Sequence, residues 1–293
     1  MSEALWGSAP PWPAPAKLNL CLHIVGRRAD GYHLLQTAFQ FIEPLDRLRF
    51  YRRPDGVIER TSQLEGVPGD KDLVVRAARL LAERTGCARG VGIELEKNIP
   101  MQAGLGGGSS DAATVLVALN QLWDLRLNEA ELKTLGVKLG ADVPVFIGGR
   151  SAWAEGVGEI LTPYDFPERV YVVIKPRAAV STGEIFQASE LTRNSPITTI
   201  RAFLAAGGRN DCTQTVRARY PEVAEALDWL GDYGTAQLTG TGACVFAALP
   251  DVDAAERVRT RLPPRWTGFV TVGFNRSPLL SRLAAERGVP SEP

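Results

Sequence analysis

Hydrophobic and polar residues alternate along several short segments of the chain, with the period of a β-strand. In residues 17–25, Leu18, Leu20, Leu22 and Ile24 share one face, so this segment is predicted to be a strand with one buried side. Similar patterns predict further strands at residues 34–42, 45–52, 91–95, 151–154, 169–175, 243–249 and 268–274.

Apolar residues spaced three and four positions apart predict helices between these strands. Residues 70–84 carry such a stripe, and Gly86 follows it as a stop signal. Asn128 and Glu131 have the spacing of a capping box at the start of another helix, which Gly140 ends. Further helices are predicted at residues 109–125, 182–189, 197–206, 221–231, 251–262 and behind Pro278.

The order of these elements predicts an α+β protein of two domains, which a length of 293 residues fits. Gly148 and Gly149 indicate where the transition from the first domain to the second begins, and we place the domains at residues 1–155 and 156–293. The final β-α-β-α stretch is typical of a split-βαβ, ferredoxin-like layer with an antiparallel sheet. The proline-rich first fifteen residues are expected to form a loose arm.

Charge and composition argue against two classes of partner. The chain has 33 basic and 33 acidic residues, a net charge of zero, whereas duplex-binding proteins usually carry a basic excess. The best apolar run, residues 112–119, is far shorter than a membrane span. We therefore expect neither nucleic acid nor a membrane as a partner.

The cysteines and the N-terminus point to a cytoplasmic protein. The four cysteines form no CxxC pair, which is typical of reduced, mostly buried thiols, and the N-terminus lacks the pattern of a secretory signal. With only two histidines and no Cys/His cluster, we expect no structural zinc site.

The strongest chemical signal is a glycine-rich turn. Four of the five residues from 104 to 108 are glycine, a predicted strand precedes them, and a predicted helix follows. Glycines let backbone N–H groups approach a ligand closely, and the helix N-terminus favours an anion. We interpret the turn as a phosphate site formed by Pro100, Met101, Gln102, Ala103, Gly104, Leu105, Gly106, Gly107, Gly108, Ser109 and Ser110. The alternative is a tight turn that only lets strand and helix pack.

The common nucleotide motifs are missing. The chain contains no Gly-Lys dipeptide, so the usual phosphate loop is absent, and the run Gly104-x-Gly106-x-x ends at Ser109 where a dinucleotide fingerprint needs glycine. The HRD and DFG elements of protein kinases are also absent.

The turn instead resembles the second motif of the GHMP kinase superfamily. Residues 14–20 (APAKLNL) resemble its first motif, and residues 238–246 (LTGTGACVF) resemble its third. The Gly-Glu-His continuation typical of mevalonate and galactose kinases is missing, whereas residues 27–33 read RRADGYH. This combination, which extends over residues 13–274, resembles the branch that phosphorylates a cytidine diphosphate-linked methylerythritol.

The resemblance implies a fold and a reaction. The expected fold is an N-terminal nucleotide-binding domain with a ribosomal-protein architecture, followed by the ferredoxin-like domain. The expected reaction transfers the γ-phosphoryl group of ATP, with Mg²⁺, to the 2-hydroxyl of that small-molecule substrate. Another superfamily kinase, a non-catalytic nucleotide sensor and an RNA-binding protein remain less favoured alternatives.

The resemblance also implies roles for residues. Lys17 and Asp142 match the catalytic pair; their ordinary interpretations are a solvated strand lysine and a turn aspartate. In a loose phosphoryl-transfer transition state, an ordinary aspartate suffices to accept the hydroxyl proton late, and a lysine steadies developing charge. Asn19 shares the strand face of Lys17 and is assigned to substrate, while Lys97 is assigned to ATP.

A cytosine pocket is expected from Tyr32, His33 and Phe186, with Thr182 in the same run as Phe186. Without the motifs, Phe186 would be interpreted as a core residue and His33 as a structural histidine. The chain departs from the family pattern at three positions, where Gln102 replaces a small residue, Asp72 replaces Asn, and Cys212 replaces an aliphatic residue.

Overall fold

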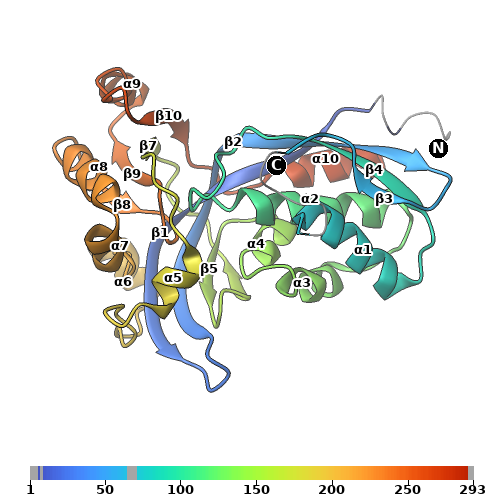
Figure 1. Cartoon of the computed structure of the whole chain (residues 1–293), viewed down its shortest axis with the longest axis horizontal. Coiled ribbons are helices and arrows are strands. Elements are labelled where there is room, and N and C mark those ends of the chain that lie inside the picture. Colours follow the sequence, from blue (N-terminus) through green and yellow to red (C-terminus); the bar gives the residue numbers. More distant parts are fainter. Residues whose placement is uncertain (1–5, 7–8, 65–70, 290–293) are drawn as a thin grey trace.

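The computed structural model describes residues 6, 9–64 and 71–289, so residue 70 of the predicted helix 70–84 lies outside it. Two lobes lie side by side, and the hairpin of β1 (Trp12–Arg27) and β2 (His33–Arg53) runs past both of them (Figure 1). The α+β architecture with two domains is confirmed.

The first lobe is built on a mixed sheet. The strand order is β3 (Ile58–Arg60), β4 (Gly90–Glu96), β2, β5 (Ala152–Glu155) and β6 (Ile160–Pro163), and β1 pairs with β2. Strand β2 covers both predicted segments 34–42 and 45–52, because its pairing with β1 continues from His33 to Leu48. The first half of β2 also pairs with β5 and its second half with β4. This one long strand therefore connects the β5 side of the sheet to the β4 side.

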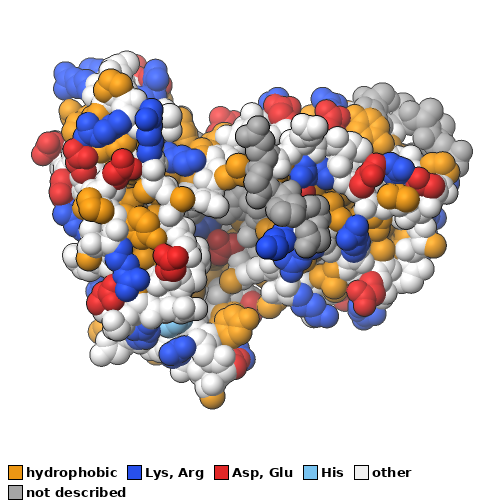
Figure 2. Space-filling model, in the orientation of Figure 1, with side chains coloured by type: hydrophobic (Ala, Val, Ile, Leu, Met, Phe, Trp, Pro, Cys, Tyr) orange, Lys and Arg blue, Asp and Glu red, His pale blue; other side chains and the backbone are white. Residues whose placement is uncertain are grey.

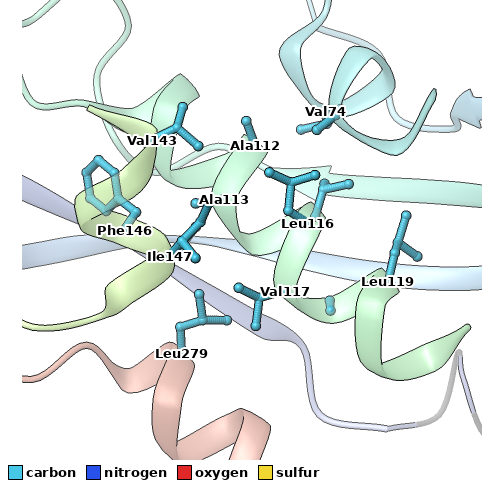
Figure 3. Packing of buried hydrophobic residues seen from close by; sticks show 14 of the residues in the cluster. Val74, Ala112, Ala113, Leu116, Val117, Leu119, Val143, Phe146, Ile147 and Leu279 are labelled. Carbon is cyan, nitrogen blue, oxygen red and sulfur yellow. The ribbon is translucent and has the colours of Figure 1, made fainter. Parts of the chain in front are cut away.

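The helices of this lobe are α1 (Leu73–Thr85), α2 (Gly107–Leu122), α3 (Glu129–Val137), α4 (Val143–Gly148) and α10 (Pro278–Arg287). Helices α1, α2 and α10 pack against the sheet, and α3 and α4 pack against α2. Helix α2 is apolar on nearly every side because it is the central helix, packed among α1, α4 and α10 (Figure 3). The capping box of Asn128 and Glu131 forms as predicted, and Gly86 ends α1 in the left-handed conformation.

The second lobe is a four-stranded antiparallel sheet. Its order is β10 (Thr267–Val272), β7 (Val170–Lys175), β9 (Val245–Leu249) and β8 (Gln237–Leu238). The helices of this half of the chain are α5 (Thr182–Gln187), α6 (Ile200–Ala206), α7 (Thr213–Arg219), α8 (Pro221–Gly231) and α9 (Val252–Arg259). Leu22 and Ile24 of β1 join the core of this lobe, so the hairpin ties the two lobes together.

The prediction of a loose arm over the first fifteen residues is wrong for residues 12–15, which belong to a strand. Strand β1 already begins at Trp12, whose side chain is only 3% exposed and packs in the core of the first lobe. Pro13 and Pro15 are tolerated because β1 has only β2 as a strand partner among the described residues, and a proline on an outer strand interrupts no inner ladder.

The lobes are not continuous in sequence. Strand β6 still pairs with β5 in the first sheet, and α10 packs against β1 and α2 after the chain has completed the second sheet. The division at residues 155 and 156 therefore stays a prediction. The short elements β3, α4, β6, α7 and β8 were not predicted, because two to seven residues carry too little periodicity.

Candidate active site

A cavity of about 1030 Å³ opens beside the glycine-rich turn of residues 100–110, called the phosphate turn below. Strands β1 and β2 and helix α5 of the second lobe also line it. Figure 2 shows the surface hollowed between the lobes. The cavity is lined by every predicted site residue except Ser110, which is fully buried in the first turn of α2. The structure therefore brings the three motifs together around one space.

The backbone of the turn requires glycine at two positions. Gly104 and Gly106 have φ values of 75° and 74°, in the left-handed region that favours glycine. A Cβ on Gly104 would lie 2.2 Å from the carbonyl oxygen of Thr239, and one on Gly106 would lie 2.9 Å from Phe146. Gly106 is the N-cap of α2, and the residues of the first turn up to Ser109 line the cavity. The N-terminus of α2 therefore faces the cavity.

The third motif braces this turn. Thr239 Oγ1 donates to the carbonyl of Gly104 over 3.2 Å, and the backbone N–H of Cys244 donates to the carbonyl of Ala103 over 3.1 Å. Asn210 in turn donates to the carbonyls of Leu238 and Gly240, at 2.8 and 2.7 Å. The second lobe thus fixes the shape of the phosphate turn on the first.

Lys17 is buried at the centre of the site, with its side chain 3% exposed. Its Nζ lies 3.3 Å from Asp142 Oδ2 and donates to the carbonyl of Gly104 over 3.0 Å and to Asn19 Oδ1. The ring of Phe39 lies below the amine, 5.5 Å from Nζ to the centroid. A lysine held by these partners keeps its charge at one position between the turn and Asp142.

Asn19 is positioned by a second hydrogen bond. Its Nδ2 donates to Thr37 Oγ1 on the neighbouring strand over 2.9 Å, which turns Oδ1 toward Lys17. The prediction that Lys17 and Asn19 share a strand face fits this geometry, and both side chains line the cavity.

Asp142 occupies the N-cap position of α4, followed by Pro144 at the second helical residue. Its side chain makes no capping hydrogen bond and is 31% exposed toward the cavity. Because the carboxylate does not cap its helix, it remains available to a ligand on the side away from Lys17.

Lys97 lies between two buried carboxylates. Its Nζ contacts Asp46 and lies 2.8 Å from Asp111 Oδ2. Burial opposes the charge on Lys97, but Asp111 and Asp46 raise the pKa of the amine. Burial also raises the pKa of Asp111 well above its ordinary value. Asp46 further accepts from the backbone N–H of Ile99, so this cluster anchors the strand end before the phosphate turn.

The residues of the predicted cytosine pocket meet at the far end of the cavity. Tyr32, in the β1–β2 turn, is 65% exposed. The ring of His33 lies 5.1 Å from that of Phe186 in α5, at an interplanar angle of 31°. Thr182 Oγ1 lies 2.9 Å from Thr241 Oγ1, which ties α5 to the third motif. An aromatic wall of His33 and Phe186 therefore faces the cavity, with Tyr32 free at its rim.

The three departures from the family pattern have local structural consequences. Gln102 has a φ of 52°, the left-handed conformation in which a small residue such as glycine is the usual choice. Asp72 caps α1 by accepting from the N–H of Val74 and pairs with Arg60. Cys212 is fully buried, and burial raises the pKa of its thiol to about 12.

Four neighbours of the site were missed from the sequence: Asp46, Thr37, Asp111 and Arg193. Asp111 ends the glycine-rich run and could have been considered with it. The other three carry no local pattern, because only the fold brings them to the predicted residues.

Family models match both halves of the chain. The description "GHMP kinases N terminal domain" matches residues 72–150, and "GHMP kinases C terminal" matches residues 188–266. The chain belongs to the GHMP kinase family. It is therefore an ATP-dependent kinase, as the motifs predict, and the resemblance inferred from the sequence is confirmed.

Curated relatives within the GHMP kinases are similar over nearly the whole chain. The 4-diphosphocytidyl-2-C-methyl-D-erythritol kinase of Alkalilimnicola ehrlichii is 55% identical over 276 residues, which cover 94% of this chain and 95% of the relative. The protein of the same name from Nitrosococcus oceani is 55% identical over 272 residues, covering 93% and 97%.

Solved structures of GHMP kinases share the fold. The crystal structure of a 4-(cytidine 5'-diphospho)-2C-methyl-D-erythritol kinase matches with a TM-score of 0.77 and 34% identity, over 90% of this chain and 98% of that one. A Methanococcus jannaschii mevalonate kinase matches with a TM-score of 0.68 and 14% identity, over 90% of this chain and 98% of that one, which shows the fold alone.

Among the described residues, no helix is long and apolar enough to cross a membrane.

Proposed function

We propose that this kinase transfers the γ-phosphoryl group of ATP to the 2-hydroxyl of 4-diphosphocytidyl-2-C-methyl-D-erythritol, giving ADP and the 2-phosphate. The observation that carries the proposal is the Lys17–Asp142 pair, which lies in one cavity with the glycine-rich turn and the contacting rings of His33 and Phe186. The similarity to relatives of that name supports this choice of alcohol.

The pair would act on the hydroxyl group. Asp142 orients the alcohol and accepts its proton late, because a loose transition state needs little nucleophile activation. Lys17 places positive charge beside the carboxylate, where negative charge develops during the transfer. Its bond to the Gly104 carbonyl holds this charge against the phosphate turn.

ATP would place its phosphates against the backbone N–H groups of the turn and the N-terminus of α2. Mg²⁺ would accompany it and neutralise phosphate charge. Asp111 lines the cavity beside the turn, and its buried Oδ1 has no hydrogen-bond partner in the described part of the chain. An oxygen donor of this kind fits a hydrated Mg²⁺ that is held mainly through phosphates.

The substrate would cross the cavity from the pair to the aromatic wall. Its cytosine would lie at Tyr32, His33 and Phe186, and its methylerythritol hydroxyls near Asn19 and Asp142. A cytoplasmic location, without nucleic-acid or membrane partners, agrees with soluble phosphorylated substrates.

A panel of alcohols tests the proposal. The pure protein is incubated with ATP, Mg²⁺ and one of four candidates: the cytidylyl substrate, mevalonate, galactose or homoserine. ADP release only with the cytidylyl substrate would support the proposal. Faster ADP release with another alcohol than with the cytidylyl substrate would contradict the proposal and indicate a different GHMP kinase activity.

A further inference from the structure

Strand β1 carries a bulge at the wall of the cavity. The pairing of β1 with β2 shifts between Asn19 and Cys21, where β1 has one more residue than the segment of β2 opposite it. A bulge interrupts the regular ladder and redirects the side chains beside it, so a polar side chain there needs a further contact to hold one orientation. The buried hydroxyl of Thr37, on β2, provides this contact for Asn19.

The hydrogen bonds of Thr37 run in one direction. Its Oγ1 donates its single hydrogen to the carbonyl of Cys21 over 2.5 Å. The same oxygen lies 2.9 Å from Asn19 Nδ2 and can only accept there, so the amide group turns its nitrogen to Thr37. The amide oxygen of Asn19 then faces Lys17, whose ammonium group can only donate.

The opposite orientation of the amide would oppose two donors at a buried site. An Asn19 side chain turned by 180° would place its NH₂ group against the ammonium of Lys17. Lys17 would keep Asp142 and the carbonyl of Gly104 as polar partners but lose the oxygen on the side of Asn19. The position of its charge relative to Asp142 would then be less strictly defined.

We propose that Thr37 is a positioning residue for phosphoryl transfer, which fixes the orientation of the Asn19 amide and, through it, the charge of Lys17. The proposal rests on the proposed function, because it takes Lys17 to act in the reaction. Thr37 borders the cavity, but its hydroxyl is engaged by Asn19 and Cys21, so its effect on the reaction passes through Asn19.

Steady-state kinetics of two variants test this role. Thr37→Val keeps the shape of the side chain but removes the hydroxyl, whereas Thr37→Ser keeps the hydroxyl. We expect Thr37→Val to lower kcat by about tenfold or more, the effect of a mispaired buried polar group, with ATP affinity nearly unchanged. Thr37→Ser should retain most of the wild-type kcat.

Thr114→Val is the matched control. Thr114 is buried in α2, and its hydroxyl also donates to a carbonyl of β1, that of Pro13, over 3.5 Å. It is not among the described residues that line the cavity. This variant also removes a threonine hydroxyl beside β1, and it should keep the wild-type kcat.

Two further measurements separate positioning of Asn19 from support of the bulge. In an Asn19→Ala background, Thr37→Val should lower kcat no further, because Thr37 acts only through Asn19. Hydrogen exchange of the Asn19 side-chain amide, followed by ¹⁵N NMR of the ligand-free protein, gives a readout that does not depend on activity. The signals, identified by their loss in Asn19→Ala, should exchange slowly in the wild type and Thr37→Ser and faster in Thr37→Val.

The outcomes are distinct. A loss of kcat in Thr37→Val that is absent in Thr37→Ser and in the Asn19→Ala background supports the proposal. An unchanged kcat in Thr37→Val overturns it, as does a loss that persists in the Asn19→Ala background or an amide that exchanges equally fast in all variants. The rates are measured with whichever alcohol of the panel the wild type phosphorylates. A preference for another alcohol would therefore overturn the proposed substrate, while the same variants still decide the role of Thr37.

Discussion

Lys17 Nζ lies 3.3 Å from Asp142 Oδ2, although one residue belongs to the first strand and the other to the start of α4. Helix α4 packs against α2 and α3, and α2 packs against β1, so the pair is fixed by the core of the first lobe. The charge arrangement of the site therefore exists before any ligand binds.

Asp142→Asn should lower kcat while leaving ATP affinity nearly unchanged. The amide keeps the shape but cannot accept the hydroxyl proton, and positioned acid–base groups contribute about 10²–10⁴ in rate. Steady-state kinetics and ATP titration check this. The control is Asp165→Asn on an exposed loop, which should behave as wild type. An Asp142→Asn enzyme with more than about half of the wild-type kcat would refute the role of Asp142.

Gly106→Ala should weaken ATP binding more than Gly108→Ala does. The new Cβ on Gly106 would lie 3.0 Å from Lys17 Cε, at a φ that costs a non-glycine residue roughly 1–2 kcal/mol. The Cβ on Gly108 would meet only the end of the Leu73 side chain, at 3.2 Å. Calorimetric ATP titration compares them, and equal affinities in both variants would mean that the turn has no special role.

Sequence patterns predicted the glycine turn and the main strands, because each has a local signature. The catalytic roles of Lys17 and Asp142 follow from the resemblance to the GHMP kinase motifs and stay predictions. Thr37, Asp46 and Arg193 had no local signature: they meet Asn19, Lys97 and His33 only through long-range packing. The strand at Trp12 was missed because its prolines suggested a loop, whereas an outer strand tolerates them.

Tyr32→Ala should weaken binding of the cytidylyl substrate by about 5- to 150-fold, the range for loss of base stacking on an aromatic ring. The side chain is 65% exposed, so its removal should leave the melting temperature unchanged. Substrate and ATP affinities are measured on the same variant. Equal losses for both ligands would indicate general damage, and no loss would leave Tyr32 without a role in binding.

Lys97→Met should destabilise the fold by roughly 3–5 kcal/mol, the cost of breaking a buried ion pair from one side. Asp46 and Asp111 would then be two buried carboxylates without their shared cation. Adding Asp111→Asn should recover part of this loss, because Asp46 then has no second carboxyl group beside it. Urea unfolding at neutral pH measures both variants, and a Lys97→Met protein as stable as the wild type would contradict the account.

His33 should titrate below 6.5, because burial and the charges of Arg193 and Arg27 lower its pKa. A histidine whose pKa is lowered by folding contributes full stability above its unfolded pKa, and this contribution declines as pH falls below it. Titration of the imidazole signals by NMR checks this. Arg193→Leu should raise the midpoint, and a midpoint at or above 6.5 in the wild type would contradict the described surroundings of His33.

The product of the reaction tests the central claim most directly. The enzyme is incubated with ATP, Mg²⁺ and 4-diphosphocytidyl-2-C-methyl-D-erythritol, and ³¹P NMR follows the wild type and Asp142→Asn in parallel. The account predicts a new phosphomonoester on the 2-oxygen with an equal amount of ADP, formed far more slowly by Asp142→Asn. A phosphate on another hydroxyl, no new phosphomonoester, or equal rates in the two proteins would contradict it.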